Sequence, residues 1–215
     1  MKIDFSVTFL LPEIELGLFY KKIKRVLNLF DIKEDPGFYK LEFEKELKVI
    51  HEVGEEVFFD IENIYVQLGK TQGYSQEYNW SGPKLCAYVF RQSPYCFLYI
   101  DFPVNIIAKL IKASEMDKFY DILRTIYSVF NAFGVMGDFD LPLTLKNHKE
   151  LAQNFLANPD NSGYPYSLGL FHQSIANEIE RQLNLEQWNK KALDDQLILY
   201  TAKDFFENID IMAKE

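Results

Sequence analysis

Cysteine is scarce in this sequence: Cys86 and Cys96 are the only two among 215 residues. They lie in adjacent apolar runs that predict the two arms of a β-hairpin. A two- or four-residue loop would set Cys86 opposite Tyr99 and Cys96 opposite Val89, with the thiols on opposite faces. A three-residue loop would put both on one face, but about 13 Å apart, beyond the Cα limit near 7 Å for a disulfide. We therefore expect two free thiols, as is typical of a reducing cytosol.

Glycine and proline are also few, at 10 and 8 residues, which excludes a low-complexity chain. Long uncharged apolar runs are missing as well. The longest stretch without Asp, Glu, Lys or Arg, 161–177, is interrupted by glycine, proline and histidine. The first residues alternate polar and apolar side chains and include Asp4, unlike the continuous apolar run of an export signal. These absences predict a cytoplasmic protein that spans no membrane.

Positive charge is in deficit. Against 23 Lys and Arg there are 32 Asp and Glu, so the net charge is −9 and the pI is about 5.0. An acidic surface repels the phosphates of nucleic acids and the headgroups of anionic lipids, which disfavours both as partners. A basic protein, a small molecule or an uncharged partner remains.

Short catalytic and metal-binding signatures are absent from the sequence. Gly69-Lys70-Thr71 resembles half of a phosphate-binding loop, but Ile64 stands where that motif requires its first glycine. There is no Gly-x-Gly-x-x-Gly, Cys-x-x-Cys or His-Glu-x-x-His pattern, and no nucleophile elbow around Ser162. The expectation is a non-catalytic protein that uses no cofactor and no metal.

Apolar residues, by contrast, are abundant: they make up 48% of the chain and include 19 Phe and 13 Tyr. A chain of this length removes roughly 70% of its unfolded surface from water, so it needs no disulfide or metal to hold a core. We expect residues 1–215 to form a single α+β domain.

Strand-like alternation is concentrated before residue 102. The predicted strands are 3–9, 38–50, 57–61, 64–68, 85–90, 95–102, 167–171 and 197–201. Helical spacing predicts helices over 16–30, from 103, over 116–133, and after Asn147, Ser174 (as N-cap), around Trp188 and from Lys203. The expected fold is α+β: a mostly antiparallel sheet of about five to seven strands, with helices packed on one face. Its core face should hold Phe5, Val7, Leu41 and Phe43.

Two acids follow Gly137. Asp138 and Asp140 would share one side of an extended segment, as paired carboxylates at metal sites do. His148 and His172 would complete a site only if the fold brought them near. The alternative function is therefore a small-molecule or metal-dependent enzyme that uses these four residues. The more ordinary interpretation is a solvated turn and two hydrogen-bonded histidines.

The acids are concentrated in one segment. Between Asp31 and Glu62 there are 11 acids and 4 bases, which gives −7 of the total −9. Glu42, Glu44 and Glu46 would share one strand face at intervals of about 7 Å. Such a field speeds encounter with a basic protein and favours one orientation. The alternative is a solvated sheet edge protected by charge.

A predicted loop over 70–84 carries Tyr74, Tyr78 and Trp80 between polar residues. These residue types are enriched at protein contacts, although the rings could instead fold back as a lid on the sheet. With the acidic segment, they predict a protein-binding module, in its most concrete form an inhibitor or immunity-type protein that covers a basic partner. The predicted contact residues are Glu42, Glu44, Glu46, Tyr74, Tyr78 and Trp80.

Overall fold

A computed structural model describes residues 4–12, 14–29, 38–43, 50–56, 63–69, 85–92, 95–139, 167–181 and 185–214. The first six strands are β1 (Asp4–Pro12), β2 (Phe38–Phe43), β3 (Ile50–Glu56), β4 (Asn63–Gly69), β5 (Leu85–Gln92) and β6 (Tyr95–Pro103). The later strands are β7 (Gly134–Phe139), β8 (Leu168–His172), β9 (Trp188–Ala192) and β10 (Leu197–Ala202). The helices are α1 (Leu16–Leu29), α2 (Val104–Lys112), α3 (Met116–Phe130), α5 (Gln173–Glu180) and α6 (Phe205–Met212), with a 3-10 turn η1 (Leu185–Gln187).

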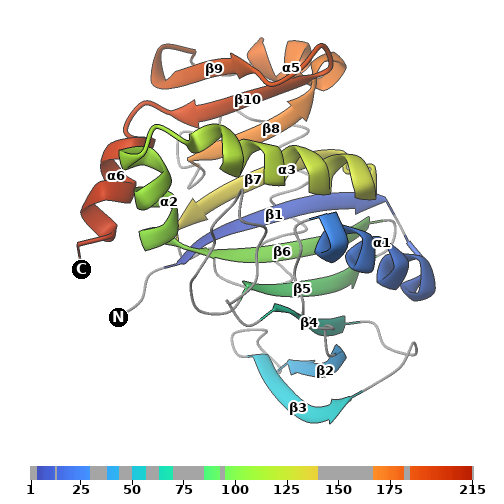
Figure 1. Cartoon of the computed structure of the whole chain (residues 1–215). Helices are drawn as coiled ribbons and strands as arrows, with labels where there is room; N and C mark the ends of the chain where they lie inside the picture. Colours follow the sequence, from blue (N-terminus) through green and yellow to red (C-terminus); the bar gives the residue numbers. More distant parts are fainter. Residues whose placement is uncertain are drawn as a thin grey trace.

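The strands form one ten-stranded sheet in the order β3-β2-β4-β5-β6-β1-β7-β8-β10-β9 (Figure 1). Each pair of neighbours is antiparallel. This confirms the α+β class and an antiparallel sheet that joins 3–9 and 85–102 with Phe38–Phe43 of the predicted strand 38–50. Ile50, the predicted end of that strand, instead begins β3, and residues 44–49 and the predicted strand 57–61 lie outside the described residues. The sheet exceeds the expected five to seven strands because β7, β8, β10 and β9 extend it beyond β1.

The core lies between the sheet and four of the helices. β1 places Phe5, Val7 and Phe9 on this side, and all three are fully buried. The Phe5 ring meets Phe119 of α3 at a centroid distance of 6.4 Å and Phe205 of α6 at 5.4 Å, both edge-on. We call this side, covered by α1, α2, α3 and α6, the helix face (Figure 1).

The opposite side of the sheet, the far face, is covered in part by α5. Ala176 and Ile179 of this helix pack with Phe171, Ile198 and Tyr200 in a second apolar cluster. The prediction of helices on one face is therefore confirmed for the main helix layer, and α5 is the addition on the other side.

Close packing in the sheet depends on glycine. A Cβ at Gly137 would lie 2.8 Å from the Phe5 ring, so this ring lies across the backbone of β7. On the far face, a Cβ at Gly134 or at Gly169 would lie 2.7 Å from the Phe171 ring. Real Cβ atoms do not approach other atoms so closely, so a larger residue would have to displace the ring.

The β5–β6 hairpin differs from prediction in register. Cys86 pairs with Asp101 and Cys96 with Arg91, so the pairing is two residues away from the predicted partners Tyr99 and Val89. The last described pair of the ladder is Gln92 with Tyr95, which accounts for the shift. A shift of two preserves the alternation of a strand, so the two cysteines still hold positions of opposite parity. Their redox state stays a prediction.

Three further differences concern the C-terminal part. Trp188 begins strand β9, where a helix was expected. His172, and not Ser174, is the N-cap of α5, since its ring accepts a hydrogen bond from the Ser174 N–H. The predicted helix after Asn147 lies outside the described residues, as do the side chains of Leu41 and Phe43. Among the helices that the structure describes, none is long and apolar enough to span a membrane.

Candidate functional site

The acidic segment supplies one edge of the sheet. β3 is the outermost strand, β2 is its neighbour, and the two pair with Glu42 opposite His51 and Leu41 opposite Glu52. The register shifts between Tyr39 and Leu41, a bulge of the kind common at sheet edges. Four of the segment's acids stand on these strands. We call β2 and β3 the acidic edge hairpin; its acids are Glu42, Glu52, Glu55 and Glu56.

Of the predicted contact residues, the structure places Glu42, on β2. The others, Glu44, Glu46, Tyr74, Tyr78 and Trp80, lie outside the described residues. The strands that flank the aromatic loop are nevertheless described: β4 ends at Gly69, which pairs with Leu85 at the start of β5. Since β4 also pairs with β2, the loop begins and ends one and two strands from the acidic edge hairpin. The two predicted contact surfaces therefore come from the same half of the sheet.

A second candidate lies on the far face, where β1, β7 and β8 bring polar groups together. Asp138 stands opposite Ser6 of β1. Its Oδ1 accepts hydrogen bonds from the Phe139 N–H (2.8 Å) and from the Ser167 hydroxyl (3.3 Å). Burial raises the pKa of Asp138 to about 6, with a smaller contribution from Asp204, while the two hydrogen bonds oppose the rise. A carboxyl group with such a pKa can exchange a proton near neutral pH.

Two hydroxyl groups of β1 point to the same face. Ser6 is 6% exposed and Thr8 2% exposed. Among the described residues, the buried Thr8 hydroxyl has no hydrogen-bond partner. A buried polar group in that state costs about 1–3 kcal/mol, so this face departs from the usual satisfaction of buried polar atoms.

The four residues of the enzyme alternative do not gather in the described structure. Asp138 lies level with Ser167, just before β8, whereas His172 ends β8 five residues later, about 17 Å along the strand. Asp140 and His148 are outside the described residues. Nowhere in the described ranges do three or more His, Cys, Asp or Glu side chains come together as a metal site.

His172 has structural contacts instead. Its Nδ1 lies 2.8 Å from the Ser174 hydroxyl and 3.2 Å from the Ser174 nitrogen. Its backbone N–H also hydrogen-bonds the Tyr127 hydroxyl of α3. These contacts fix the junction of β8 and α5 and favour the ordinary interpretation of this histidine.

The other edge of the sheet carries ion pairs that sequence reasoning missed. Lys190 of β9 pairs with Glu180 of α5 on the far face, and Lys191 pairs with Asp117 of α3 on the helix face. Tyr200 also donates to Glu180, and the bond to Lys190 is the main reason why the pKa of Glu180 is lowered. Adjacent lysines on a strand point to opposite faces, so β9 is tied to helices on both sides. No sequence spacing indicated these partners.

No protein-family model matches the chain, and no curated protein matches it. Among solved structures, it is similar to the Pseudomonas aeruginosa T6SS protein PA0821, with a TM-score of 0.45 and 11% identity over 93% of this chain and 68% of that one. It is also similar to a chain from the crystal structure of the toxic C-terminal tip of CdiA from Pseudomonas aeruginosa in complex with its immune protein. That TM-score is 0.40, with 15% identity over 66% of this chain and 89% of the other. At TM-scores below 0.5 neither similarity carries an argument about function, which therefore rests on the residues.

Proposed function

We propose that this chain is a non-catalytic protein-binding module, of the inhibitor or immunity type, that covers a basic protein with its acidic edge hairpin. One observation carries the proposal: the segment that holds −7 of the net charge of −9 supplies the strands at one edge of the sheet. An edge is the part of a sheet that an approaching protein can reach along its whole length.

The charge acts before contact. A field of one sign around the hairpin steers a basic partner towards it and raises the association rate, an effect that salt weakens. An edge strand can also accept an extended segment through backbone hydrogen bonds, which provides affinity without a deep pocket. Both contributions suit a compact protein whose task is to cover another.

The aromatic loop supplies the short-range part of the proposal. It starts after Gly69 of β4, the strand next to the acidic edge hairpin, and ends before Leu85 of β5. Tyr74, Tyr78 and Trp80 would then serve as buried anchors of the contact, where aromatic residues contribute most of the binding energy. If Trp80 is such an anchor, Trp80→Ala should raise the dissociation rate at a cost of roughly 2 kcal/mol or more.

The test compares two charge-reversed triple variants with the wild-type chain. The first variant reverses the charge near the edge with three substitutions, Glu42→Lys, Glu44→Lys and Glu46→Lys. Proteins captured from the native cell by each form are identified by mass spectrometry, and association and dissociation rates are then measured for the captured partner. We expect a basic protein that associates more slowly with this variant and with weaker salt dependence, while dissociation changes little.

The control variant makes the same change in net charge elsewhere. Its residues are exposed and distant in sequence from the hairpin: Glu178→Lys, Asp195→Lys and Glu207→Lys. It should associate nearly as fast as the wild type. Equal slowing by both variants would trace the effect to net charge alone, and a partner bound equally by all three forms would contradict the proposal.

A further inference from the structure

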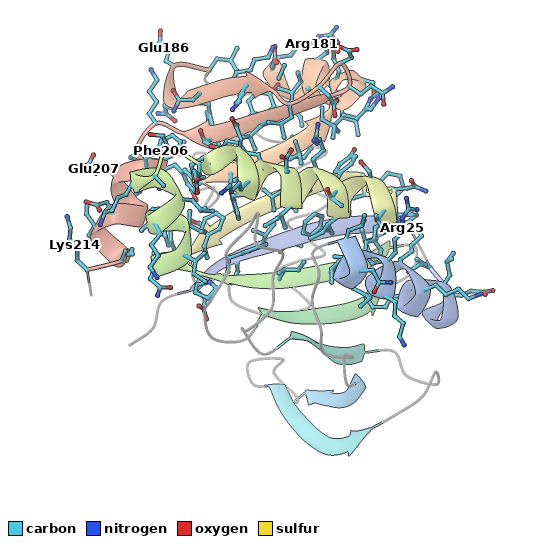
Figure 2. The ribbon with its side chains drawn as sticks, in the orientation of Figure 1. Arg25, Arg181, Glu186, Phe206, Glu207 and Lys214 are labelled. Carbon is cyan, nitrogen blue, oxygen red and sulfur yellow. The ribbon has the colours of Figure 1, made fainter. Side chains whose placement is uncertain are left out.

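The outer side of α1 carries two exposed cations, Lys21 and Arg25. The helix contains four cations and no acid: Lys21, Lys22, Lys24 and Arg25. Lys21 and Arg25 are exposed, and neither is held by an ion pair or a hydrogen bond in the part of the chain that the structure describes. Figure 2 shows Arg25 on α1, at the opposite end of the molecule from Glu207 and Lys214 of α6.

Several cations on other helices and on β9 are paired. On α3, Arg124 pairs with Asp121, and Lys118 pairs with Glu115 just before the helix. On other elements the pairs are Lys112–Asp210, Lys214–Asp210, Lys190–Glu180 and Lys191–Asp117. Unlike α3, which carries Asp117 and Asp121, α1 has no acid of its own that could pair with its cations.

Two exposed leucines flank these cations. Leu18 is 49% exposed and Leu29 51% exposed. Residues 18, 21, 25 and 29 follow steps of three and four, so they form one continuous stripe along the helix. Arginine is enriched at protein contacts, and exposed apolar side chains beside it can contribute to the same contact surface. We call Leu18, Lys21, Arg25 and Leu29 the α1 stripe.

Lys22 lies beside the α1 stripe and faces α3. Its Nζ lies 5.6 Å from the centre of the Phe130 ring, a cation–π contact with α3. Burial lowers the pKa of Lys22, and repulsion by Arg25 lowers it further. An acidic surface laid against α1 would offset this repulsion.

The chain itself contains a surface of that chemistry. The acidic edge hairpin has the opposite charge and stands at a sheet edge, where a second copy can reach it. An anionic lipid surface would be attracted by α1 but repelled by the remainder of a chain whose net charge is −9. A second copy has the same net charge, but its acidic hairpin offers a local patch of negative charge that α1 can contact.

We propose that α1 is a self-association surface, and that the α1 stripe of one copy docks on the acidic edge hairpin of a second copy. α1 and the hairpin occupy the same half of the molecule (Figure 1). A two-fold dimer therefore forms the contact twice, since each copy gives its stripe to the other's hairpin. The dimer covers the surface assigned above to a basic partner, so self-association and partner binding exclude each other. It needs no partner to form, so it can be tested on the pure chain.

The experiment measures the mass of the wild-type chain by sedimentation velocity at about 0.1 M and about 1 M salt, where the screening lengths are about 10 Å and about 3 Å. We expect a dimer at the lower salt concentration and dissociation at the higher one. Two charge-reversed variants, Lys21→Glu/Arg25→Glu and Glu52→Lys/Glu55→Lys, should each lose at least about tenfold in association constant, because each now places like charges at both contacts.

The decisive experiment mixes the two variants. In the mixed dimer, the reversed stripe of one variant meets the reversed hairpin of the other, and the second contact joins an unchanged stripe to an unchanged hairpin. Both contacts therefore join opposite charges again. We expect the mixture to recover the dimer that neither variant forms alone, which also shows that both variants are folded. The matched control Lys109→Glu/Lys203→Glu makes the same change in net charge at exposed positions outside the stripe and should keep the wild-type dimer.

Three results would overturn the proposal. One is a wild-type chain that is monomeric at both salt concentrations. Another is a mixture of the two variants that fails to associate while both keep the wild-type urea midpoint. The third is a wild-type chain that stays monomeric but binds phosphatidylserine vesicles through Lys21 and Arg25, which would assign the α1 stripe to lipid.

Discussion

The two faces of β1 are both buried, yet they differ in chemistry. On the helix face, Phe5, Val7 and Phe9 pack against the helices with no polar atom among them. On the far face, Ser6 and Thr8 are 6% and 2% exposed and lie level with β7, which contributes Asp138. One strand thus takes part in an apolar core and in a buried polar layer. Burial alone therefore does not show that a face stabilises the fold, because the far face is buried and yet contains polar groups that cost stability.

The packing of the helix face is needed for folding, whereas the polar groups of the far face are available for a function. The helix face holds rings in edge-on contact, such as Phe102 and Phe119 with centroids 5.1 Å apart. The far face holds an unpartnered hydroxyl and a carboxyl group whose pKa burial has raised. Proteins commonly depart from optimal packing where function or specificity is at stake. The following predictions test whether the two faces respond oppositely to substitution.

The largest effect is expected on the helix face. Phe119→Ala removes a fully buried ring that meets Phe5, Phe102 and Tyr120. It should lower the free energy of unfolding by roughly 3–5 kcal/mol, measured by urea denaturation. The matched control is Phe206→Ala, because that ring is 37% exposed and should cost far less. Similar losses for both variants would contradict the assignment of the core.

Gly137→Ala tests the same face from the sheet side. The new methyl group would lie 2.8 Å from the Phe5 ring and force it to move. Overpacking of this kind costs about 1–3 kcal/mol, again measured by urea denaturation. The double variant Gly137→Ala/Phe5→Leu should show less than the sum of the two single losses, since the clash is absent without the ring. Additive losses would mean that the methyl group is accommodated elsewhere.

On the far face, removal of a polar group should stabilise. Thr8→Val replaces the unpartnered hydroxyl by a methyl group of similar size, so the free energy of unfolding should rise by roughly 1–2 kcal/mol. Ser167→Ala is the contrasting variant. The Ser167 hydroxyl donates a hydrogen bond to Asp138, so its removal should not raise the free energy of unfolding. A destabilised Thr8→Val protein would show that the hydroxyl has a partner in solution.

The smallest effect is a dependence on pH from Asp138. Its pKa is about 6 in the folded chain against an ordinary 3.8, so folding disfavours the charged form. Stability from this group is fully present below about pH 4 and is lost as the pH rises through about 6. Asp138→Asn should remove that loss, which is on the order of 1 kcal/mol because water still reaches the carboxyl group. The measurement is the difference between the two proteins' urea midpoints at pH 4 and pH 7, and an unchanged pH profile would contradict the buried carboxyl.

Hydrophobic periodicity correctly predicted the helices and strands that bury one apolar face. β1, α1 and α3 were placed correctly because each buries a long apolar stripe at period 2 or 3.6. β9 was predicted as helix around Trp188, since four of its five residues are exposed and carry no alternation between core and solvent. The β5–β6 register was wrong by two residues, because a nearly continuous apolar run offers no alternation that would fix the position of the turn.

The sequence predicted the acidic segment but not the surroundings of Asp138 or Lys191. The acidic segment could be recognised because charge is a property of the sequence itself, and its position at the sheet edge is what the structure adds. The environment of Asp138 could not be predicted, because Ser167 approaches from the segment just before β8, 29 residues later. The same holds for Lys191, whose partner Asp117 lies 74 residues earlier. Contacts between distant segments leave no spacing to detect.

The central position of β1 sets an order of events during synthesis. Its two neighbours, β6 and β7, begin at Tyr95 and Gly134, so the strand cannot complete either ladder until much of the chain has been made. At about 5–20 residues per second, a ribosome leaves β1 without its neighbours for several seconds. During that interval its apolar residues are exposed to other chains. A nascent chain stalled before residue 95 should therefore bind chaperones, and one released after residue 139 has both ladders of β1 available.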